Sequence, residues 1–162
     1  REKKFISSVS EQAADFFASS FTGSDFETLI LRSHLWVERQ LEKIIENSVN
    51  KPNRILESRF NFSNKLAVVR ALVETDKNKN LFLLVDSLNK IRNQMAHNIE
   101  NDKLQVLIKK LNSDIILGEN NQLEDESTQK LKITLAQMYG VLIAINEVIV
   151  LEKEGETITF VG

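Results

Sequence analysis

Hydrophobic residues recur at three- and four-residue spacings along most of the chain, a pattern that predicts helices. The stretches with this pattern are 3–20, 24–48, 62–73, 80–98, 101–111 and 127–152, with a short helical turn at 54–60 after Pro52. Alternation typical of a strand falls near the C-terminus, where 156–161 could pair with 115–117. We therefore predict a single all-α domain over residues 1–162, a bundle of five to six helices with a small two-stranded β element.

The second helix carries a start signal and an unusually wide apolar surface. Ser24-Asp25-Phe26-Glu27 has the Ser-x-x-Glu form of a capping box, so its serine is expected to cap the helix. Leu31 and Leu35 add a second apolar edge to the main stripe, which indicates a place near the centre of the bundle. Asn61 or Ser63 is expected to cap the third helix.

The last helix has apolar residues around most of its circumference. One stripe runs from Leu131 to Ile149, while the opposite side holds Ile133 and Val141 among others. Such a helix is either deeply central or shared with a partner subunit. We expect a symmetric homodimer that buries part of this surface.

Polar residues interrupt the apolar face of the fourth long helix. Arg92 falls inside the stripe, while Asn89, Asn93 and His97 line its flank. An arginine there needs partners for its five donors, so it either meets a carboxylate or lines a polar cleft. We expect Arg92 to be largely removed from solvent. Glu38 is its candidate partner, with a solvated surface position as the alternative for this glutamate.

These residues carry a family resemblance. Arg92-Asn93-Gln94-Met95-Ala96-His97 resembles the Arg-x4–6-His motif of the HEPN superfamily, including the polar residue directly after the arginine. That superfamily comprises small all-α domains found among prokaryotic toxin ribonucleases and phage-defence proteins, with many non-catalytic members. The helix order also resembles the mannitol operon repressor group, through the segments Phe62-Ser63-Asn64-Lys65-Leu66 and Leu88-Asn89-Lys90-Ile91-Arg92-Asn93.

The HEPN resemblance implies a metal-independent endoribonuclease that cleaves RNA by attack of the 2′-hydroxyl and leaves a cyclic phosphate. Arg92, Asn93 and His97 would be its catalytic residues, supported by Glu38 and Asn89. Histidine can gain and lose a proton near neutral pH, and arginine offers a permanent fork for a phosphate. Asn93 lies one helical turn before His97 and could orient its ring.

One geometric difficulty accompanies this assignment. On a straight ideal helix, Arg92 and His97 point about 140° apart, so they do not meet at one phosphate. Either the helix loosens near Met95, or the motif of a second subunit completes the site. The resemblance implies the second arrangement, since catalytic members of the superfamily are generally built as dimers.

A second class of function fits the same residues. In a non-catalytic helical interaction or transcription-regulatory module of the mannitol-repressor kind, Arg92 would pair with a carboxylate and His97 would cap carbonyls at the helix end. The direction of the two side chains separates the two hypotheses. A shared open cleft favours the enzyme, whereas engagement with protein groups in a closed interior favours the module.

Composition limits the remaining classes of protein. With 42% hydrophobic and 27% charged residues and no cysteine, the chain is typical of a globular cytoplasmic protein without disulfides. A net charge of −2 argues against a broad nucleic-acid-coating surface, although a local basic site remains compatible with it. Neither a signal peptide nor an uninterrupted apolar run of about 18 residues is present, so we expect no membrane insertion.

The sequence also bears on cofactors and partners. His34 lies one turn before Glu38, but two histidines and no cysteine argue against a dedicated zinc site, and we predict no cofactor. The expected partners are a second copy of the chain, RNA if the motif is catalytic, and an antitoxin or regulatory protein. Because the chain begins at Arg1 rather than methionine, we expect that residues precede it.

Overall fold

The computed structural model of the chain describes residues 2–57, 59–97, 106, 109 and 124–155. These residues contain six helices: α1 (Glu2–Ser20), α2 (Phe26–Ser48), α3 (Asn53–Leu56), α4 (Phe62–Val73), α5 (Lys79–Ala96) and α7 (Glu124–Lys153). The predicted all-α bundle is confirmed, and most helix bounds agree within a few residues. The strand pairing predicted for 115–117 and 156–161 lies outside the described residues, as does nearly all of the helix predicted at 101–111.

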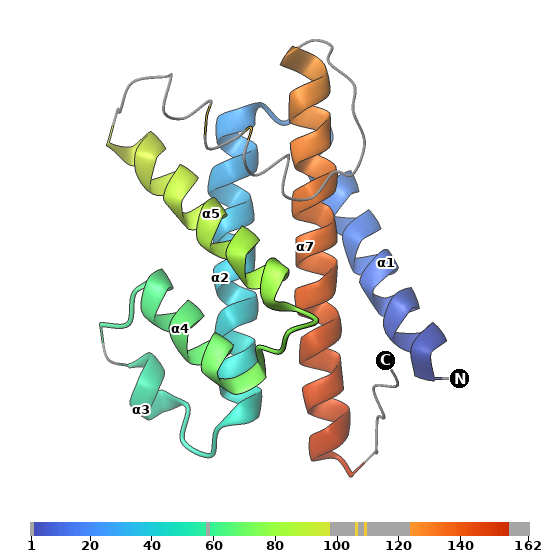
Figure 1. The fold of residues 1–162 in the computed structure, drawn as a ribbon, viewed down its shortest axis with the longest axis vertical. Coiled ribbons are helices and arrows are strands. Elements are labelled where there is room, and N and C mark those ends of the chain that lie inside the picture. The colour runs from blue at the N-terminus through green and yellow to red at the C-terminus, as the bar shows by residue number, and fades with distance from the viewer. Residues whose placement is uncertain (1, 58, 98–105, 107–108, 110–123, 156–162) are drawn as a thin grey trace.

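Two long helices, α2 and α7, lie side by side in the middle of the bundle (Figure 1). Helix α1 packs along the other side of α7, while α4 and α5 pack against α2 and against each other. Helix α5 also reaches α7. Its C-terminal end points away from the centre of the bundle, at the upper left of Figure 1. The central position predicted for α2 is therefore confirmed.

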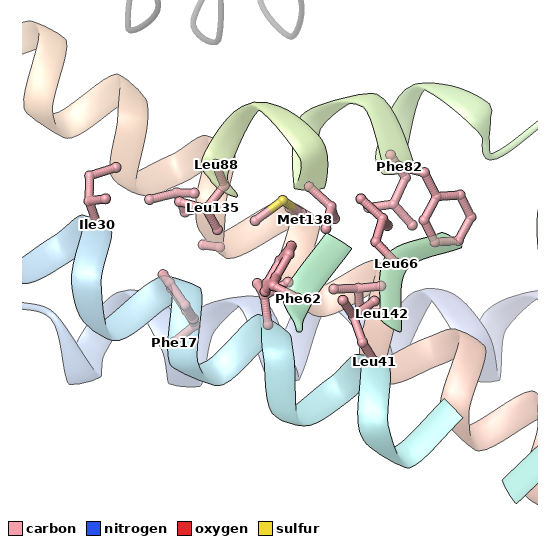
Figure 2. Packing of buried hydrophobic residues seen from close by; sticks show 14 of the residues in the cluster. Phe17, Ile30, Leu41, Phe62, Leu66, Phe82, Leu88, Leu135, Met138 and Leu142 are labelled. Atoms are coloured by element: carbon pink, nitrogen blue, oxygen red, sulfur yellow. The ribbon is translucent and has the colours of Figure 1, made fainter. Parts of the chain in front are cut away.

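The core forms where apolar faces of these helices converge (Figure 2). Burial of apolar surface stabilises such a core by about 25 cal/mol per Å². On α5, the spacing predicts an apolar stripe of Leu81, Leu84, Val85, Leu88, Ile91 and Met95. Four of these residues are buried: Leu81, Val85, Leu88 and Ile91. Phe82, which the stripe did not include, is also fully buried. The inward face of α5 is thus wider than the predicted stripe.

The caps of α2 and α4 are aspartate and asparagine side chains. Asp25 caps α2, where its Oδ1 accepts the Thr28 N–H at 2.7 Å. That hydrogen bond stabilises the carboxylate and lowers the pKa of Asp25. The prediction that Ser24 caps this helix is wrong, because an equally good capping residue follows it directly. Asn61 caps α4 by accepting the Asn64 N–H at 2.9 Å, one of the two alternatives predicted.

The second apolar edge predicted for α2 is not buried. Leu31 is 38% exposed and Leu35 is 63% exposed. Leu31 and Leu35 precede Glu38 and Glu42 by seven residues each, so they lie on the flank of α2 that meets Lys65 of α4 two turns further on. The apolar width of α2 in the sequence is therefore greater than the part of its circumference that is buried in the described structure.

Helix α7 is buried on two opposite sides within a single chain. Its first stripe faces α2 and α5, and α1 covers the side that holds Ala136, Gly140 and Ala144, which are spaced four residues apart. Ile133 and Val141 stay 55% and 38% exposed. Of the two alternatives predicted for this helix, the structure shows the central one for most of its surface.

The apolar character of α7 has a further consequence. In the described part of the chain, residues 128–153 form one helix that is long and apolar enough to cross a membrane, because it contains an 18-residue window with a mean hydropathy of 1.7. However, 56% of that window is buried inside the bundle. Burial between α1 and α2 is by itself a sufficient reason for this composition, because a core helix needs apolar residues on each side that another helix covers.

Helices α1 and α7 approach each other closely at Gly140. A Cβ atom built on Gly140 would lie 2.4 Å from the carbonyl oxygen of Ser10 and 3.1 Å from its Oγ. Real Cβ atoms essentially never come this close to a backbone oxygen. The two helices can therefore pack at this distance only because the side chain is missing.

We expect Gly140→Ala to lower the free energy of unfolding by about 1–3 kcal/mol, because the added methyl group forces α1 away from α7. A decrease in the free energy of unfolding is informative, because at an ordinary helix position alanine is more favourable than glycine by about 1 kcal/mol. Urea denaturation of the variant measures the change. Gln137→Ala, at an exposed position of the same helix, is the control and should change the urea midpoint little. A higher urea midpoint for Gly140→Ala would contradict the close approach.

Candidate functional site

The three predicted catalytic residues lie at the C-terminal end of α5. Arg92 is partly buried, Asn93 is exposed, and His97 is exposed directly after the last helical residue. Arg92 Nη1 donates a hydrogen bond to Asn93 Oδ1 at 3.1 Å. Among the described residues, no hydrogen bond joins the His97 side chain to either of them. The structure thus brings Arg92 and Asn93 into contact and leaves the imidazole exposed at the helix end.

Arg92 is partly buried, and the expectation that Glu38 is its partner is not met. Glu38 Oε1 instead accepts a hydrogen bond from Lys65 Nζ at 2.7 Å. The physical reason is the position of α4, which packs along the flank of α2 that bears Glu38 and places a lysine there. Within the described residues, no carboxylate forms an ion pair with Arg92.

Lys65 forms the centre of a three-residue charge cluster. It is 8% exposed and donates to both Glu38 and Glu42, each at 2.7 Å. The two glutamates are one helical turn apart on α2, so they present their carboxylates on the same side. Burial disfavours the lysine cation, but the two hydrogen bonds outweigh it and raise the pKa of Lys65. One cation and two carboxylates give the three residues a net charge of −1, and Arg39 Nη1 also pairs with Glu42 Oε2 at 3.1 Å.

The C-terminal end of α5 bears on two predictions for His97: that its ring caps carbonyls there, and that the helix loosens near Met95. Its backbone N–H donates to the carbonyl oxygens of Gln94 and Met95, so the main chain closes the helix and the ring is exposed. Side-chain capping by the imidazole is not what the described residues show. The helix also stays regular through Ala96, so it does not loosen near Met95. Completion of the site by a second subunit remains a prediction.

A chain of hydrogen bonds through buried His34 and Asn89 to exposed Ser63 links three helices just before this end of α5. His34 of α2 and Asn89 of α5 are 6% and 7% exposed, and His34 Nε2 lies 3.0 Å from Asn89 Oδ1. Asn89 Nδ2 donates to Ser63 Oγ of α4 at 3.2 Å. Because Asn89 uses its N–H in that bond, its oxygen accepts from His34 Nε2–H. The ring of Phe62 stacks on the imidazole, with the ring centroids 4.2 Å apart.

His34 is held in its neutral form. Burial lowers the pKa of His34, and the positive charges of Arg92 and Lys65 act in the same direction. The hydrogen bond to Asn89 and the charge of Glu38 favour the cation but are outweighed. At neutral pH the ring therefore carries one proton, on Nε2, and no charge.

No functional role was predicted for His34 from the sequence, although the chain contains a signal for it. His34 follows Ile30 by four residues and precedes Leu41 by seven, which places it on the same helical stripe as two core residues. Asn89 was predicted as a supporting residue, and the structure shows what it contacts. In the described part of the chain, no group of three histidine, cysteine, aspartate or glutamate side chains could hold a metal ion.

Comparison with protein-family models, with curated proteins and with solved structures gives no match for this chain. The HEPN resemblance therefore depends on the segment from Arg92 to His97 and on the order of the helices. An all-α bundle hosts many unrelated functions, so the fold adds little to that resemblance. The residues of the site are therefore the basis for any proposed function.

The neutral His34 should make the stability of the fold depend on pH. Because its pKa is below 6.5 in the folded chain, the unfolded chain binds the proton more readily, and the free energy of unfolding decreases as the pH falls below 6.5. Urea midpoints measured from about pH 7 to about pH 5, above the range where most carboxylates titrate, should show this decrease.

Two variants isolate the contribution of His34. His34→Gln cannot titrate, so its urea midpoint should decrease less over this pH range. His97→Ala leaves His34 in place and should keep the part of the decrease that His34 causes. Equal pH dependence in the wild-type protein and His34→Gln would show that His34 is not the group responsible.

Proposed function

We propose that this chain is a metal-independent endoribonuclease of the HEPN kind, active as a homodimer. The observation that supports it is the accessibility of the motif. Asn93 and His97 are exposed, and Arg92 has no carboxylate partner in the parts of the chain that the structure describes. A guanidinium that is not neutralised by a carboxylate remains able to bind a phosphate group.

In the proposed reaction, the 2′-hydroxyl of RNA attacks the adjacent phosphorus atom. A base removes the hydroxyl proton, the bond from phosphorus to the 5′-oxygen breaks, and an acid protonates that oxygen. The products are a 2′,3′-cyclic phosphate and a 5′-hydroxyl end. His97 carries the proton transfer, Arg92 stabilises the negative charge on the phosphate, and Asn93 holds the Arg92 guanidinium through the observed hydrogen bond.

The dimer supplies what one copy of the motif lacks. The reaction needs both a base and an acid on opposite sides of the phosphate, and α5 carries a single histidine at its end. The regular helix through Ala96 also keeps Arg92 and His97 on different sides of α5. Two motifs related by a two-fold axis would provide two imidazoles and two guanidinium groups around one phosphate.

A second candidate function is a non-catalytic helical interaction or transcription-regulatory module of the mannitol-repressor kind. The observation that favours it is that Asn89 is buried and hydrogen-bonded to protein groups, to buried His34 and to Ser63. In this case the polar residues of α5 would stabilise the bundle, and the exposed leucines of α2, Leu31 and Leu35, would contact a regulatory protein.

Substitution of the motif tests the enzyme. His97→Ala and Arg92→Ala should each lower RNA cleavage by about 100-fold or more, because each removes a group that acts in the transition state. EDTA should have no effect. Cleavage of a labelled RNA measures the activity of each variant, and thermal unfolding measures its stability. His97→Ala should melt as the wild-type protein does, since an exposed side chain away from the core changes stability by about 0.5 kcal/mol or less.

Lys90→Ala is the matched control for these variants, because Lys90 is an exposed cation on the same helix that lies outside the motif. It should keep full cleavage. Activity that persists in His97→Ala, or that stops on chelation, would exclude the proposed chemistry and leave the interaction module as the better hypothesis.

The dimer has its own test. Light scattering at micromolar concentration should give twice the chain mass of 18.5 kDa, and the contact should bury more than about 1,000 Å² in total. A monomer mass under these conditions would argue against the dimeric site. Cleavage by a monomer would show that one copy of the motif suffices.

A further inference from the structure

We propose that His34 is a positioning residue, which fixes the Arg92–Asn93 end of α5 through its hydrogen bond to Asn89. His34 is not part of the motif from Arg92 to His97, and it lies on a different helix, α2. The positioning of the helix end by His34 is independent of what that end binds. The consequence of this positioning for catalysis rests on the proposed function.

Asn89 is held from two sides, one turn before the motif. It precedes Arg92 by three residues and Asn93 by four on α5. Its amide accepts from His34 on α2 and donates to Ser63 on α4. A side chain held from two neighbouring helices resists both rotation and sliding of its own helix. Asn89 therefore sets the direction in which the next turn of α5 points.

His34 is itself rigid. Its ring is 6% exposed and stacks on Phe62 with an interplanar angle of 26°. Phe62 is the first residue of α4, which Asn61 caps directly before it. The imidazole therefore has one orientation, and its Nε2–H points at Asn89. A donor fixed in this way can position its acceptor.

The charges around the imidazole also favour this arrangement. The charged groups that act on it are Glu38 from α2, Lys65 from α4 and Arg92 from α5. Lys65 is neutralised by Glu38 and Glu42, which leaves Arg92 as the cation without a carboxylate partner among the described residues. A charged His34 would repel Arg92, so the neutral ring allows the helix end to stay where Asn89 holds it.

Two substitutions at one position separate positioning from general stability. In His34→Gln, the amide N–H can replace Nε2–H as the donor to Asn89, and the side chain does not titrate. In His34→Leu, no donor remains, and Asn89 Oδ1 is buried without a partner. The two variants therefore differ in the hydrogen bond to Asn89, while the side chain fills the space of the imidazole in both.

Amide hydrogen exchange followed by NMR is the primary measurement. In His34→Leu, exchange of the amides of residues 92–96 should increase about tenfold or more, while amides in the middle of α7 should exchange as in the wild-type protein. His34→Gln should stay close to the wild-type pattern. An equal increase across all helices, or no increase at residues 92–96, would overturn the proposal.

Ser63→Ala keeps the test decisive if His34→Leu does not fold. It removes the other partner of Asn89 from an exposed position and should raise exchange at the same amides to a smaller extent. Unchanged exchange in a folded Ser63→Ala would show that the chain of hydrogen bonds does not hold the helix end.

RNA cleavage provides the second measurement. His34→Leu should lower kcat with little change in KM, because the groups that act on the phosphate are displaced. His34→Gln should have a kcat close to that of the wild-type protein. Protonation of His34 at acidic pH should lower the kcat of the wild-type protein, and His34→Gln should lack this part of the decrease. Wild-type kcat in a folded His34→Leu would overturn the consequence for catalysis. If the wild-type protein does not cleave RNA, the proposed function fails, and the exchange data alone decide the positioning role.

Discussion

The packing of α2 between α7 on one flank and α4 and α5 on the other is the constraint on which the rest of the structure depends. Val37, Leu41 and Ile44 of α2 are fully buried in this contact. Because the helix is covered on both flanks, polar residues near the edges of its apolar stripe are also removed from water. Each of them needs a hydrogen-bond partner from another helix.

Those polar pairs give the bundle its register. A hydrogen bond needs its donor and acceptor about 2.7–3.2 Å apart and well aligned, so it is lost when one helix slides along another. His34 pairs with Asn89 of α5, and Gln40 pairs with Asn146 of α7, where Asn146 Nδ2 donates to Gln40 Oε1 at 3.1 Å. Both pairs join residues far apart in the chain, so they specify how α5 and α7 sit against α2.

Helix α5 connects this interior to the proposed site. Its first turns supply core residues such as Leu81 and Phe82, its middle carries Asn89, and its last turn brings Asn93 and His97 to the surface. A candidate site on such a helix is supported by the bundle itself rather than by a loop. This is the arrangement expected where side chains must meet a phosphate in a defined direction.

The sequence by itself determined the helices, because periodicity and capping residues act within about one turn of the chain. It also placed Arg92, Asn93 and His97 at the end of one helix. Only the tertiary structure decided the partners. Glu38 pairs with Lys65 rather than with Arg92, and His34 pairs with Asn89. Helix α1 covers the second side of α7. The physical reason is that periodicity shows which face of a helix is apolar but not which other helix covers it. A polar residue at the edge of such a face can meet any neighbour, and the choice depends on how all the helices pack together.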